Sequence, residues 1–254
     1  MRFDGKTVVV VGGSSGVGKS AAGKFAEQGA NVVMLGLRPD EGDTFAKHLT
    51  DRGLSAQFWQ CDWTSMEQLE RIAKATAEQF GQIDVLYNHA GTILVKPFLE
   101  TSDGEWTEIM ETNLMGMVRS IRCFLPHMLG SADASIVNMA SISGLSASAM
   151  EAAYCVSKGA CVQLTRAIAA EFRDRGVRCN AVCPGFIRTD HGNHELRELQ
   201  ALGAIKGIED ITTLQGRMSE PDEIADAVLF LASHDSRFIN GEMLVVDNAA
   251  MATT

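Results

Sequence analysis

The chain has 254 residues, of which 46% are hydrophobic and 21% are charged, a composition typical of a globular protein rather than a disordered or fibrous one. Asp and Glu outnumber Lys and Arg by 32 to 22, so the net charge is −10 and nucleic acid is not expected as a partner. No apolar run reaches the roughly 18 residues of a membrane span. Residues 1–6 lack the apolar segment of a secretory signal, so we expect a cytoplasmic protein without a membrane partner.

Short apolar runs rich in β-branched residues recur along the chain and predict strands that are buried on both faces. Seven such runs lie at residues 7–11, 31–35, 55–59, 83–87, 134–139, 177–182 and 243–246. Helical patterns separate them, among them 16–28, 65–80, 151–173 and 221–232. We expect the helix at 65–80 to begin with a capping box of Ser65 and Gln68, and the helix at 221–232 to be capped by Ser219.

The alternation of strands and helices predicts an α/β fold, a doubly wound sheet of about seven mostly parallel strands with helices on both faces. No repeat, linker or low-complexity segment divides the chain, so we expect a single domain over residues 1–254. In such sheets ligands bind beyond the carboxyl ends of the strands. The residues directly after each strand are therefore the candidates for a functional site.

The cysteines predict neither a metal site nor disulfides. None of them forms a CxxC pair, and no histidine stands at zinc-binding spacing. In a cytoplasmic chain they are expected to be small buried side chains. They are Cys61, Cys123, Cys155, Cys161, Cys179 and Cys183.

A glycine-rich segment follows the first predicted strand and fits two phosphate-binding motifs. Gly12-x3-Gly16-x-Gly18 is a dinucleotide loop, in which backbone amides at a helix N-terminus approach a phosphate. Gly13-x4-Gly18-Lys19-Ser20 also satisfies the P-loop formula of a nucleotide hydrolase or kinase. A P-loop enzyme needs a carboxylate for Mg²⁺ after another strand, and Asp62 is the candidate. A glycine-rich turn without a ligand is a third alternative.

Tyr154 and Lys158 stand four residues apart and would share one face of a helix. Such a pair often arises by chance, but Ser141 precedes it by thirteen residues, at the end of the fifth predicted strand. Asn113 lies in a helical stretch before that strand. Asn88-His89-Ala90-Gly91 and Pro184-Gly185 follow two further strands.

In this order the motifs resemble those of the short-chain dehydrogenase/reductase family over nearly the whole chain, from residue 5 to residue 247. The resemblance implies a Rossmann-like fold, a nicotinamide cofactor and a homotetramer. It also implies a catalytic tetrad of Asn113, Ser141, Tyr154 and Lys158. The expected function is that of an NAD(P)-dependent oxidoreductase that interconverts a small secondary alcohol and a ketone.

The tetrad suits this chemistry. A phenol with a pKa near 10 is a poor base, but a neighbouring ammonium and the charge of the nicotinamide favour the phenolate. A drop of ~3 units in the pKa of Tyr154 corresponds to ~4 kcal/mol. Lys158 would also hold the cofactor ribose, and Ser141 would bond the substrate oxygen. Asn113 would hold a water that connects Lys158 to solvent.

The resemblance also implies a set of cofactor contacts. Asp62 would accept from the adenine amino group or, alternatively, cap its own loop at Thr64. Thr189 would meet the nicotinamide amide or the pyrophosphate, or cap its loop. His89 departs from the commoner Asn and would touch the cofactor or pack at the strand end. The expected cofactor-binding residues are Gly12, Ser14, Ser15, Gly16, Val17, Gly18, Arg38, Asp62, Trp63, Asn88, Ala90, Gly91, Tyr154, Lys158, Pro184, Gly185, Ile187 and Thr189.

The end of the second predicted strand bears on the choice of cofactor. An acidic residue there would bind the ribose 2′-hydroxyl of NAD(H), but this position holds Gly36. Arg38 is close enough in sequence to meet the 2′-phosphate of NADP(H). Ser15 replaces a second basic residue of many NADP-dependent relatives, and Asp40 could also approach. These residues favour NADP(H) slightly over NAD(H).

The resemblance places a substrate loop at about 186–217. Its four basic and five acidic residues form no basic patch for an acyl-carrier protein or another large anion. Its apolar residues Phe186, Ile187 and Leu196 would line a pocket or pack within the loop. Leu145 and Met150, which precede the loop, would join them. The substrate itself is not specified. A non-catalytic NAD(P)-binding regulatory protein is a further alternative, against which the intact tetrad argues.

A second departure from the family pattern lies near the C-terminus. Asp247-Asn248-Ala249 stands where Asp-Gly-Gly is frequent. Glycine can adopt backbone conformations that other residues adopt only with strain. The contacts made by this segment are therefore in doubt.

Overall fold

The computed structural model describes residues 1–253, which contain a seven-stranded, wholly parallel sheet of order β3-β2-β1-β4-β5-β6-β7. The predicted doubly wound sheet is thus confirmed. The direction in which successive strands are added reverses beside β1. From β1 the chain adds β2 and β3 on one side, and it then crosses over to add β4 on the other side. The strands are β1 (Thr7–Val11), β2 (Asn31–Gly36), β3 (Ala56–Gln60), β4 (Val85–Asn88), β5 (Ala134–Met139), β6 (Val177–Pro184) and β7 (Met243–Val246).

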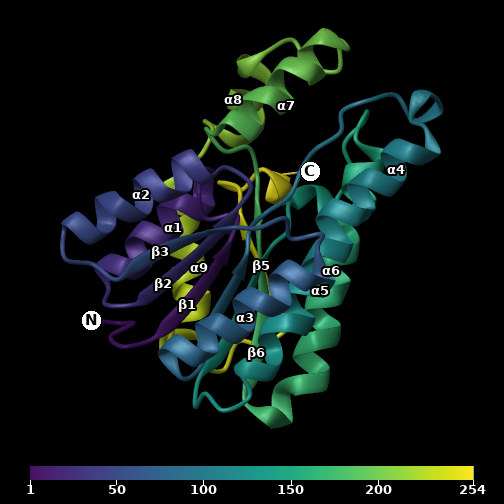
Figure 1. The fold of residues 1–254 in the computed structure, drawn as a ribbon. Coiled ribbons are helices and arrows are strands. Elements are labelled where there is room, and N and C mark those ends of the chain that lie inside the picture. The colour runs from purple at the N-terminus through teal and green to yellow at the C-terminus, as the bar shows by residue number, and fades with distance from the viewer. Residues whose placement is uncertain (254) are drawn as a thin grey trace.

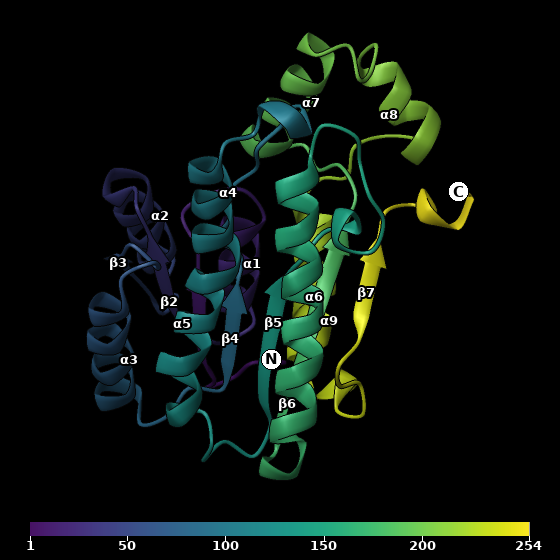
Figure 2. The ribbon, with the colours of Figure 1, turned by 90° about the vertical axis from the view of Figure 1, so that its right-hand side faces the viewer.

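Helices cover both faces of the sheet (Figures 1 and 2). One face carries α1 (Gly16–Glu27), α2 (Pro39–Asp51) and α9 (Pro221–Ala232). The other carries α3 (Met66–Phe80), α4 (Asp103–Met110), α5 (Gly116–Phe124) and α6 (Ala152–Phe172). Two helices within the predicted substrate loop, α7 (Asp190–Ala201) and α8 (Ile208–Gln215), stand beyond the carboxyl ends of the strands.

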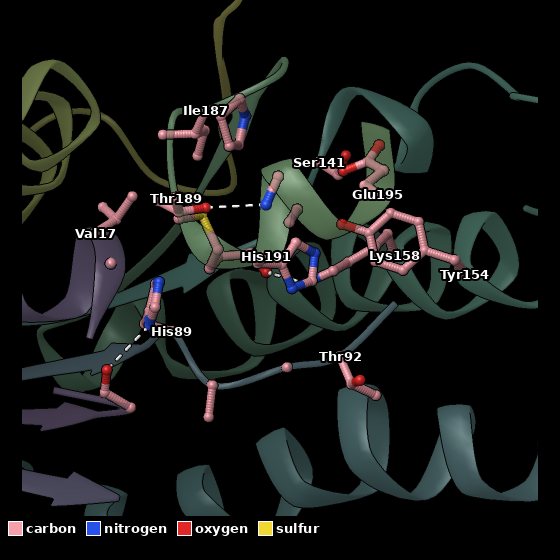
Figure 3. Close-up of a pocket in the computed structure, with 18 of the residues that line it drawn as sticks. Val17, His89, Thr92, Ser141, Tyr154, Lys158, Ile187, Thr189, His191 and Glu195 are labelled. Atoms are coloured by element: carbon pink, nitrogen blue, oxygen red, sulfur yellow. Dashed lines mark hydrogen bonds between the residues drawn. The ribbon is translucent and has the colours of Figure 1, made fainter. Parts of the chain in front are cut away.

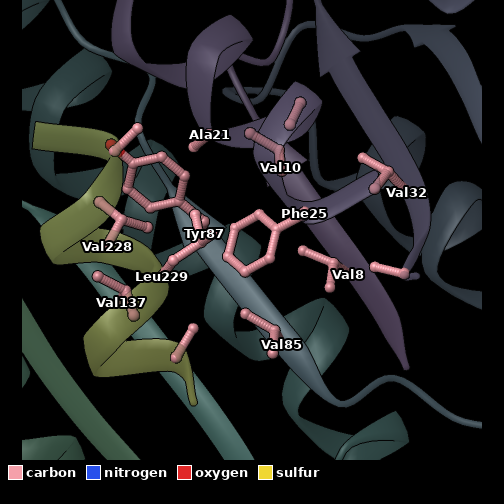
Figure 4. Packing of buried hydrophobic residues seen from close by; sticks show 14 of the residues in the cluster. Val8, Val10, Ala21, Phe25, Val32, Val85, Tyr87, Val137, Val228 and Leu229 are labelled. Atoms are coloured by element: carbon pink, nitrogen blue, oxygen red, sulfur yellow. The ribbon is translucent and has the colours of Figure 1, made fainter. Parts of the chain in front are cut away.

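The central strands are predominantly apolar because the sheet is covered on both sides. In β1, Val8 and Val10 pack beneath α1 and α9, whereas Val9 and Val11 pack on the opposite face. All four side chains are at most 1% exposed. Figure 4 shows the first cluster, in which Phe25 fills the space between α1 and the sheet. This packing fixes the strand ends on which the site is built.

Two predicted helix starts fare differently. Ser65 caps α3, since its hydroxyl accepts from Gln68 N at 3.4 Å, but the Gln68 side chain accepts from Asp62 N and leaves the box half formed. The predicted cap of α9 at Ser219 is wrong. Glu220 is the N-cap, in a reciprocal box with Glu223.

Ser219 has another task in the structure. Its hydroxyl and backbone amide both donate to Phe186 O, which ties it to the base of the substrate loop instead of to a helix.

Within residues 1–253 no helix is long and apolar enough to cross a membrane. The six cysteines are unpaired, and five of them are buried.

Candidate active site

A cavity of about 740 Å³ opens at the carboxyl ends of the strands. Loops that follow β1, β2, β4, β5 and β6 form its floor and walls, and α7 forms part of its rim. Figure 3 shows side chains from these segments converging on one space. The cavity therefore lies at the place where a doubly wound sheet binds its ligand.

The glycine loop after β1 forms one end of the cavity and can be built only from glycine at its tightest points. Gly12 has φ +86°, and a β-carbon there would lie 2.8 Å from Ala90 N. A β-carbon at Gly18 would collide with the Gly12 carbonyl oxygen. Gly16 has φ +52° and faces Thr189 across the cavity. Gly18 packs beneath the loop rather than lining the cavity.

The two residues that would complete a P-loop are engaged outside the cavity. The Lys19 ammonium lies 4.9 Å from the centre of the Phe45 ring of α2. The Ser20 hydroxyl donates to Asp222 of α9. A P-loop needs this lysine on phosphate and this hydroxyl on Mg²⁺. The geometry therefore agrees with the dinucleotide interpretation of the glycine loop.

His89 lines the cavity and also packs against Tyr87 at the end of β4. Its Nδ1 lies 3.1 Å from Gly12 O. Burial lowers the pKa of the half-buried His89 to about 4, so the ring is neutral at pH 7 and its Nδ1–H donates to the carbonyl. His89 thus holds the glycine loop against β4.

Tyr154 and Lys158 project from one face of α6 into the cavity, as their spacing predicted (Figure 3). The Lys158 Nζ lies 5.7 Å from the centre of the Tyr154 ring and donates to Met139 O at 3.0 Å. The two residues are 6% and 4% exposed. An ammonium has three N–H donors, so this buried lysine can still donate to a ligand.

Burial dominates the electrostatics of this pair. It raises the pKa of Tyr154 well above 10, the charge of Glu195 raises it further, and the Ser141 hydroxyl lowers it. Burial likewise lowers the pKa of Lys158. The phenolate expected from the sequence therefore requires a positive charge closer to the phenol than the Lys158 ammonium lies here.

Ser141 and Asn113 are brought to the same region in different roles. Ser141 lines the cavity directly after β5, and its hydroxyl accepts from Ser143 N at 3.1 Å. Asn113 lies below the cavity surface in a π-helical turn, Glu111–Met115, that interrupts the helix between α4 and α5. Its amide clasps the Thr92 backbone, accepting from N at 2.8 Å and donating to O at 2.9 Å. Such turns are frequent at functional sites.

Two expected cofactor residues point elsewhere. Asp62 accepts from Thr64 N at 2.9 Å and Thr64 Oγ1 at 2.7 Å, which realises the loop-capping alternative. Asn88 is 0% exposed, accepts from Ser120 and donates to Asn138 of β5. It fixes the end of β4 and does not line the cavity. Thr189 caps α7, because its hydroxyl accepts from Gly192 N, and it also lines the cavity.

Most of the expected site residues do meet at the cavity. Gly36 and Arg38 line the cavity at the end of β2, whereas Asp40, in the first turn of α2, does not. The Arg38 side chain is half exposed and pairs with Glu41 at 2.9 Å. The expected residues that line the cavity are Gly12, Ser14, Ser15, Gly16, Val17, Arg38, Trp63, Ala90, Gly91, Ser141, Tyr154, Lys158, Pro184, Gly185, Ile187 and Thr189.

The sequence-based site missed two residues that α7 brings to the cavity. The His191 ring centre lies 6.4 Å from that of Tyr154, and Glu195 lines the wall one turn further along. Thr189 begins α7 as its N-cap, and a cap-like residue before a polar helical stretch was the available signal. The helix places both side chains over the tetrad.

The C-terminal departure has a structural form. Asn248 and Ala249 take φ values of +50° and +68°, the region in which glycine is unstrained. The Asp247 carboxylate accepts from the backbone amides of Ala249 and Met251. The Asn248 side chain donates to Gln215 O at the end of α8. This segment therefore packs against the substrate loop without glycines.

Comparisons with known proteins agree with this geometry. The family model described as enoyl-(acyl carrier protein) reductase matches residues 11–248. The meso-2,3-butanediol dehydrogenase of Serratia marcescens is 38% identical over 254 residues, covering 100% of this chain and 97% of its own. The D-threitol dehydrogenase of Mycolicibacterium smegmatis is 36% identical and covers 97% of this chain and 93% of its own. The crystal structure of levodione reductase superposes with a TM-score of 0.94 at 26% identity, covering all of both chains.

The chain belongs to the short-chain dehydrogenase/reductase family. The resemblance stated from the motifs is thereby confirmed, and so is the Rossmann-type sheet. The protein is an NAD(P)-dependent oxidoreductase that interconverts alcohols and ketones. Its cofactor is a nicotinamide dinucleotide, and its substrate is a small molecule.

Proposed function

We propose that this enzyme transfers a hydride between NADP(H) and a small secondary alcohol or ketone, with Tyr154 as its acid/base. One observation carries the proposal. Tyr154, Lys158 and Ser141 line the same cavity as the glycine loop, although they come from α6, β5 and β1. A dinucleotide whose pyrophosphate is bound at that loop would therefore reach the tetrad with its nicotinamide end.

The residues present fit such a cofactor. The N-cap of α1, Ser15, makes no capping hydrogen bond, so the first-turn amides can meet a pyrophosphate. Gly12 and Gly16 allow its close approach, and Thr189 faces Gly16 from the opposite side. Lys158 would donate to the nicotinamide ribose. Trp63 and the other predicted contacts that line the cavity complete the proposed cofactor set.

The bound nicotinamide supplies a hydride donor or acceptor and, when oxidised, a positive charge. In the oxidation direction Tyr154 takes the alcohol proton, and in reduction it returns a proton to the carbonyl oxygen. The Ser141 hydroxyl donates to the same oxygen and stabilises its developing charge. Lys158 stabilises the phenolate, and Asn113 positions the Thr92 backbone and holds a proton-path water.

We propose NADP(H) as the preferred cofactor because Arg38 lines the adenosine end and no carboxylate occupies position 36. Arg38→Ala should weaken NADPH binding by roughly 1.5–3 kcal/mol, about 10- to 150-fold, and NADH binding much less. Arg52→Ala, at the other end of α2 and paired with Glu27, is the matched control. Equal losses for both cofactors would refute the preference.

We further propose that residues 1–254 act as one catalytic domain, with 186–217 as the substrate loop, in a cytoplasmic homotetramer. The tetramer follows from the family resemblance. On the edge strand β7 the Val245 side chain is 38% exposed, and Phe238, in the segment before β7, is 102% exposed, so association could cover both. Sedimentation should give four times 27.4 kDa, and a monomer would refute this part.

The function is tested by a screen of secondary alcohols and ketones with both cofactors, read as absorbance of the reduced nicotinamide. We expect turnover that is faster with the NADP(H) couple and lost in Tyr154→Phe. Turnover of no substrate in the screen, or Mg-ATP binding that vanishes in Lys19→Ala, would contradict the proposal.

A further inference from the structure

Two carboxyl groups stand beside Tyr154, outside the tetrad and outside the proposed cofactor contacts. Glu151 directly precedes α6 and is 1% exposed. Glu195 comes from α7 and lines the cavity. Figure 3 shows Glu195 on the same side of the cavity as Ser141 and the Tyr154 ring. The fold thus places two acids from distant segments at the substrate end of the site.

Glu151 is not used by the fold in an ordinary way. It is the N-cap residue of α6, yet its side chain makes no capping hydrogen bond. Both of its buried carboxyl oxygens lack a hydrogen-bond partner within residues 1–253. The groups close enough to affect its pKa are the Ser148 hydroxyl and the Glu195 carboxyl. A buried polar group without partners is unfavourable for stability, so its presence calls for another explanation.

The backbone before Glu151 is strained as well. Met150 has φ +66°, a conformation that favours glycine, and its carbonyl oxygen accepts from Lys96 N at 2.6 Å. Non-glycine residues in this region persist only where the surroundings impose them, and they cluster at functional sites. The strained turn leads into Glu151, whose side chain is buried beside Glu195.

Both acids are harder to ionise than exposed carboxyl groups. Burial raises the pKa of Glu151 to about 7, and burial and the neighbouring Glu151 charge raise the pKa of Glu195 well above 4.5. Two interacting carboxyl groups titrate as a pair. Ionising both is therefore unfavourable, and Glu195 offers its carboxyl oxygens as acceptors to a ligand in the cavity.

An apolar cluster lies behind this end of the cavity. Tyr154 packs in it with Ile93, Val95 and Leu199, and of the two residues that border it, Met150 and Phe186, Phe186 also lines the cavity. A substrate whose reacting oxygen meets Tyr154 and Ser141 would also meet polar side chains of α7, among them His191 and Glu195. Of these two, Glu195 is the acid and, when ionised, the stronger hydrogen-bond acceptor.

On the basis of the proposed function, we propose that Glu195, backed by Glu151, accepts a hydrogen bond from a second hydroxyl next to the reacting carbinol, so that the substrate is a vicinal diol or the matching α-hydroxy ketone. In the oxidation, the carbinol C–H bond breaks and its hydride passes to the nicotinamide. The O–H proton passes to Tyr154, and C=O forms. The second hydroxyl stays intact.

The same geometry selects against other substrates. A carboxylate or acyl-phosphate substituent at this place would meet the negative charge of the pair. A simple alcohol would leave the carboxyl oxygens unpaired. An ammonium would also suit an acid, so the test includes an amino alcohol. Both butanediol and threitol, named in two relatives, carry vicinal hydroxyls.

The test compares four substrates that share a four-carbon chain: 2,3-butanediol, 2-butanol, 3-hydroxybutyrate and 3-amino-2-butanol. We expect kcat/KM of the natural chain to be highest for the diol, by about tenfold or more over 2-butanol, and lowest for the anion. In Glu195→Leu the diol-to-butanol ratio of kcat/KM should fall about tenfold or more. In Glu195→Gln, kcat/KM for 3-hydroxybutyrate should rise.

Glu198→Gln is the matched control. Glu198 lies on the same helix, is half exposed and pairs with His194 outside the cavity, so the four kcat/KM values should not change. Unfolding curves of each variant establish that it is folded. Glu195→Gln keeps the shape of the side chain and leaves the proposal testable should Glu195→Leu fail to fold.

The outcomes separate this proposal from the proposed function. Oxidation of 2-butanol that is lost in Tyr154→Phe, with an unchanged diol-to-butanol ratio in Glu195→Leu, would overturn the diol site and leave the function standing. A higher kcat/KM for 3-amino-2-butanol than for the diol would overturn it in favour of a cation site. Turnover of none of the alcohols with either cofactor would overturn both.

Discussion

The two ends of the sheet bury carboxyl groups in opposite ways. At the amino ends of the strands, Asp84 is 2% exposed and accepts hydrogen bonds from Lys6, Thr7, Gln82 and Ser131. At the carboxyl ends, Glu151 is 1% exposed and its oxygens have no partner among residues 1–253. Burial alone would raise the pKa of Asp84, but these donors outweigh it and lower the pKa, whereas the pKa of Glu151 rises to about 7.

The contrast separates groups that stabilise the fold from groups that are held ready for a ligand. A buried carboxylate with four donors joins β1 to the segments before β4 and β5, which closes the amino end of the sheet. A buried carboxyl without donors costs stability, and proteins retain such groups at functional sites. Changes at the amino end should therefore alter unfolding, and changes at the carboxyl end should alter catalysis.

The largest effect is expected at Tyr154. Tyr154→Phe keeps the ring and removes the proton donor, so kcat should fall about 10³-fold or more, while the Kd for NADPH stays within about threefold. Stopped-flow turnover and fluorescence titration measure the two quantities. Activity within tenfold of the unchanged enzyme would remove Tyr154 from the mechanism.

At the opposite end, Asp84→Asn should lower the free energy of unfolding by about 2–4 kcal/mol, because it removes a charge that four donors surround. Because the folded pKa of Asp84 is lowered, its stabilisation is present above pH 4 and is lost as the pH falls through the folded pKa. Urea unfolding at pH 7 and pH 3 measures this.

The control for Asp84→Asn is Asp51→Asn. Asp51 forms an exposed i,i+4 pair with Lys47 on α2, and its loss should cost less than about 0.5 kcal/mol. Equal losses in the two variants would remove the distinction between a buried and an exposed carboxylate.

Glu151→Gln should show the reverse pH dependence. The raised folded pKa means that the folded state binds more protons than the unfolded state between about pH 4.5 and 7, so the natural chain loses stability as the pH rises through that window. The amide does not titrate. The variant should therefore gain stability relative to the natural chain between pH 4.5 and 8, by up to about 3 kcal/mol. A difference in unfolding free energy that does not change with pH would contradict the buried, unpaired state of Glu151.

The smallest effect is expected at Lys19. Its ammonium lies over Phe45 and away from the cavity, so Lys19→Ala should change the Kd for NADPH less than about threefold, under ~0.7 kcal/mol. A loss of 100-fold would return Lys19 to a phosphate-binding role. Lys158→Ala, which removes the buried ammonium beside Tyr154, should in contrast abolish turnover.

The sheet could be predicted because its central strands are continuous β-branched runs, a signal that survives without knowledge of the packing. Segments with a weaker hydrophobic pattern were harder to predict. Helices α7 and α8 are short and polar within the loop 186–217, and the cap of α9 shifted by one residue because Ser219 bonds the Phe186 backbone. Local patterns do not reveal a competing partner 33 residues away.

The same limit applies to the site. Tyr154 and Lys158 have a local spacing that a helix converts into a shared face, so they could be predicted. The P-loop formula was equally local, and only the packing distinguishes the alternatives, because Lys19 lies over Phe45 and Ser20 is bonded to Asp222. The pair of Glu151 and Glu195 arises when α7 folds over the start of α6. No spacing in the sequence predicts this pair.

The most direct test of the account compares Asp84→Asn with Glu195→Leu in two measurements, the free energy of unfolding and kcat/KM for 2,3-butanediol. We predict that Asp84→Asn loses about 2–4 kcal/mol of stability and keeps its kcat/KM within about twofold. Glu195→Leu should keep or gain stability and lose about tenfold or more in kcat/KM. Loss of stability in Glu195→Leu with an unchanged kcat/KM would contradict the account, because the buried acid would then support the fold rather than the substrate.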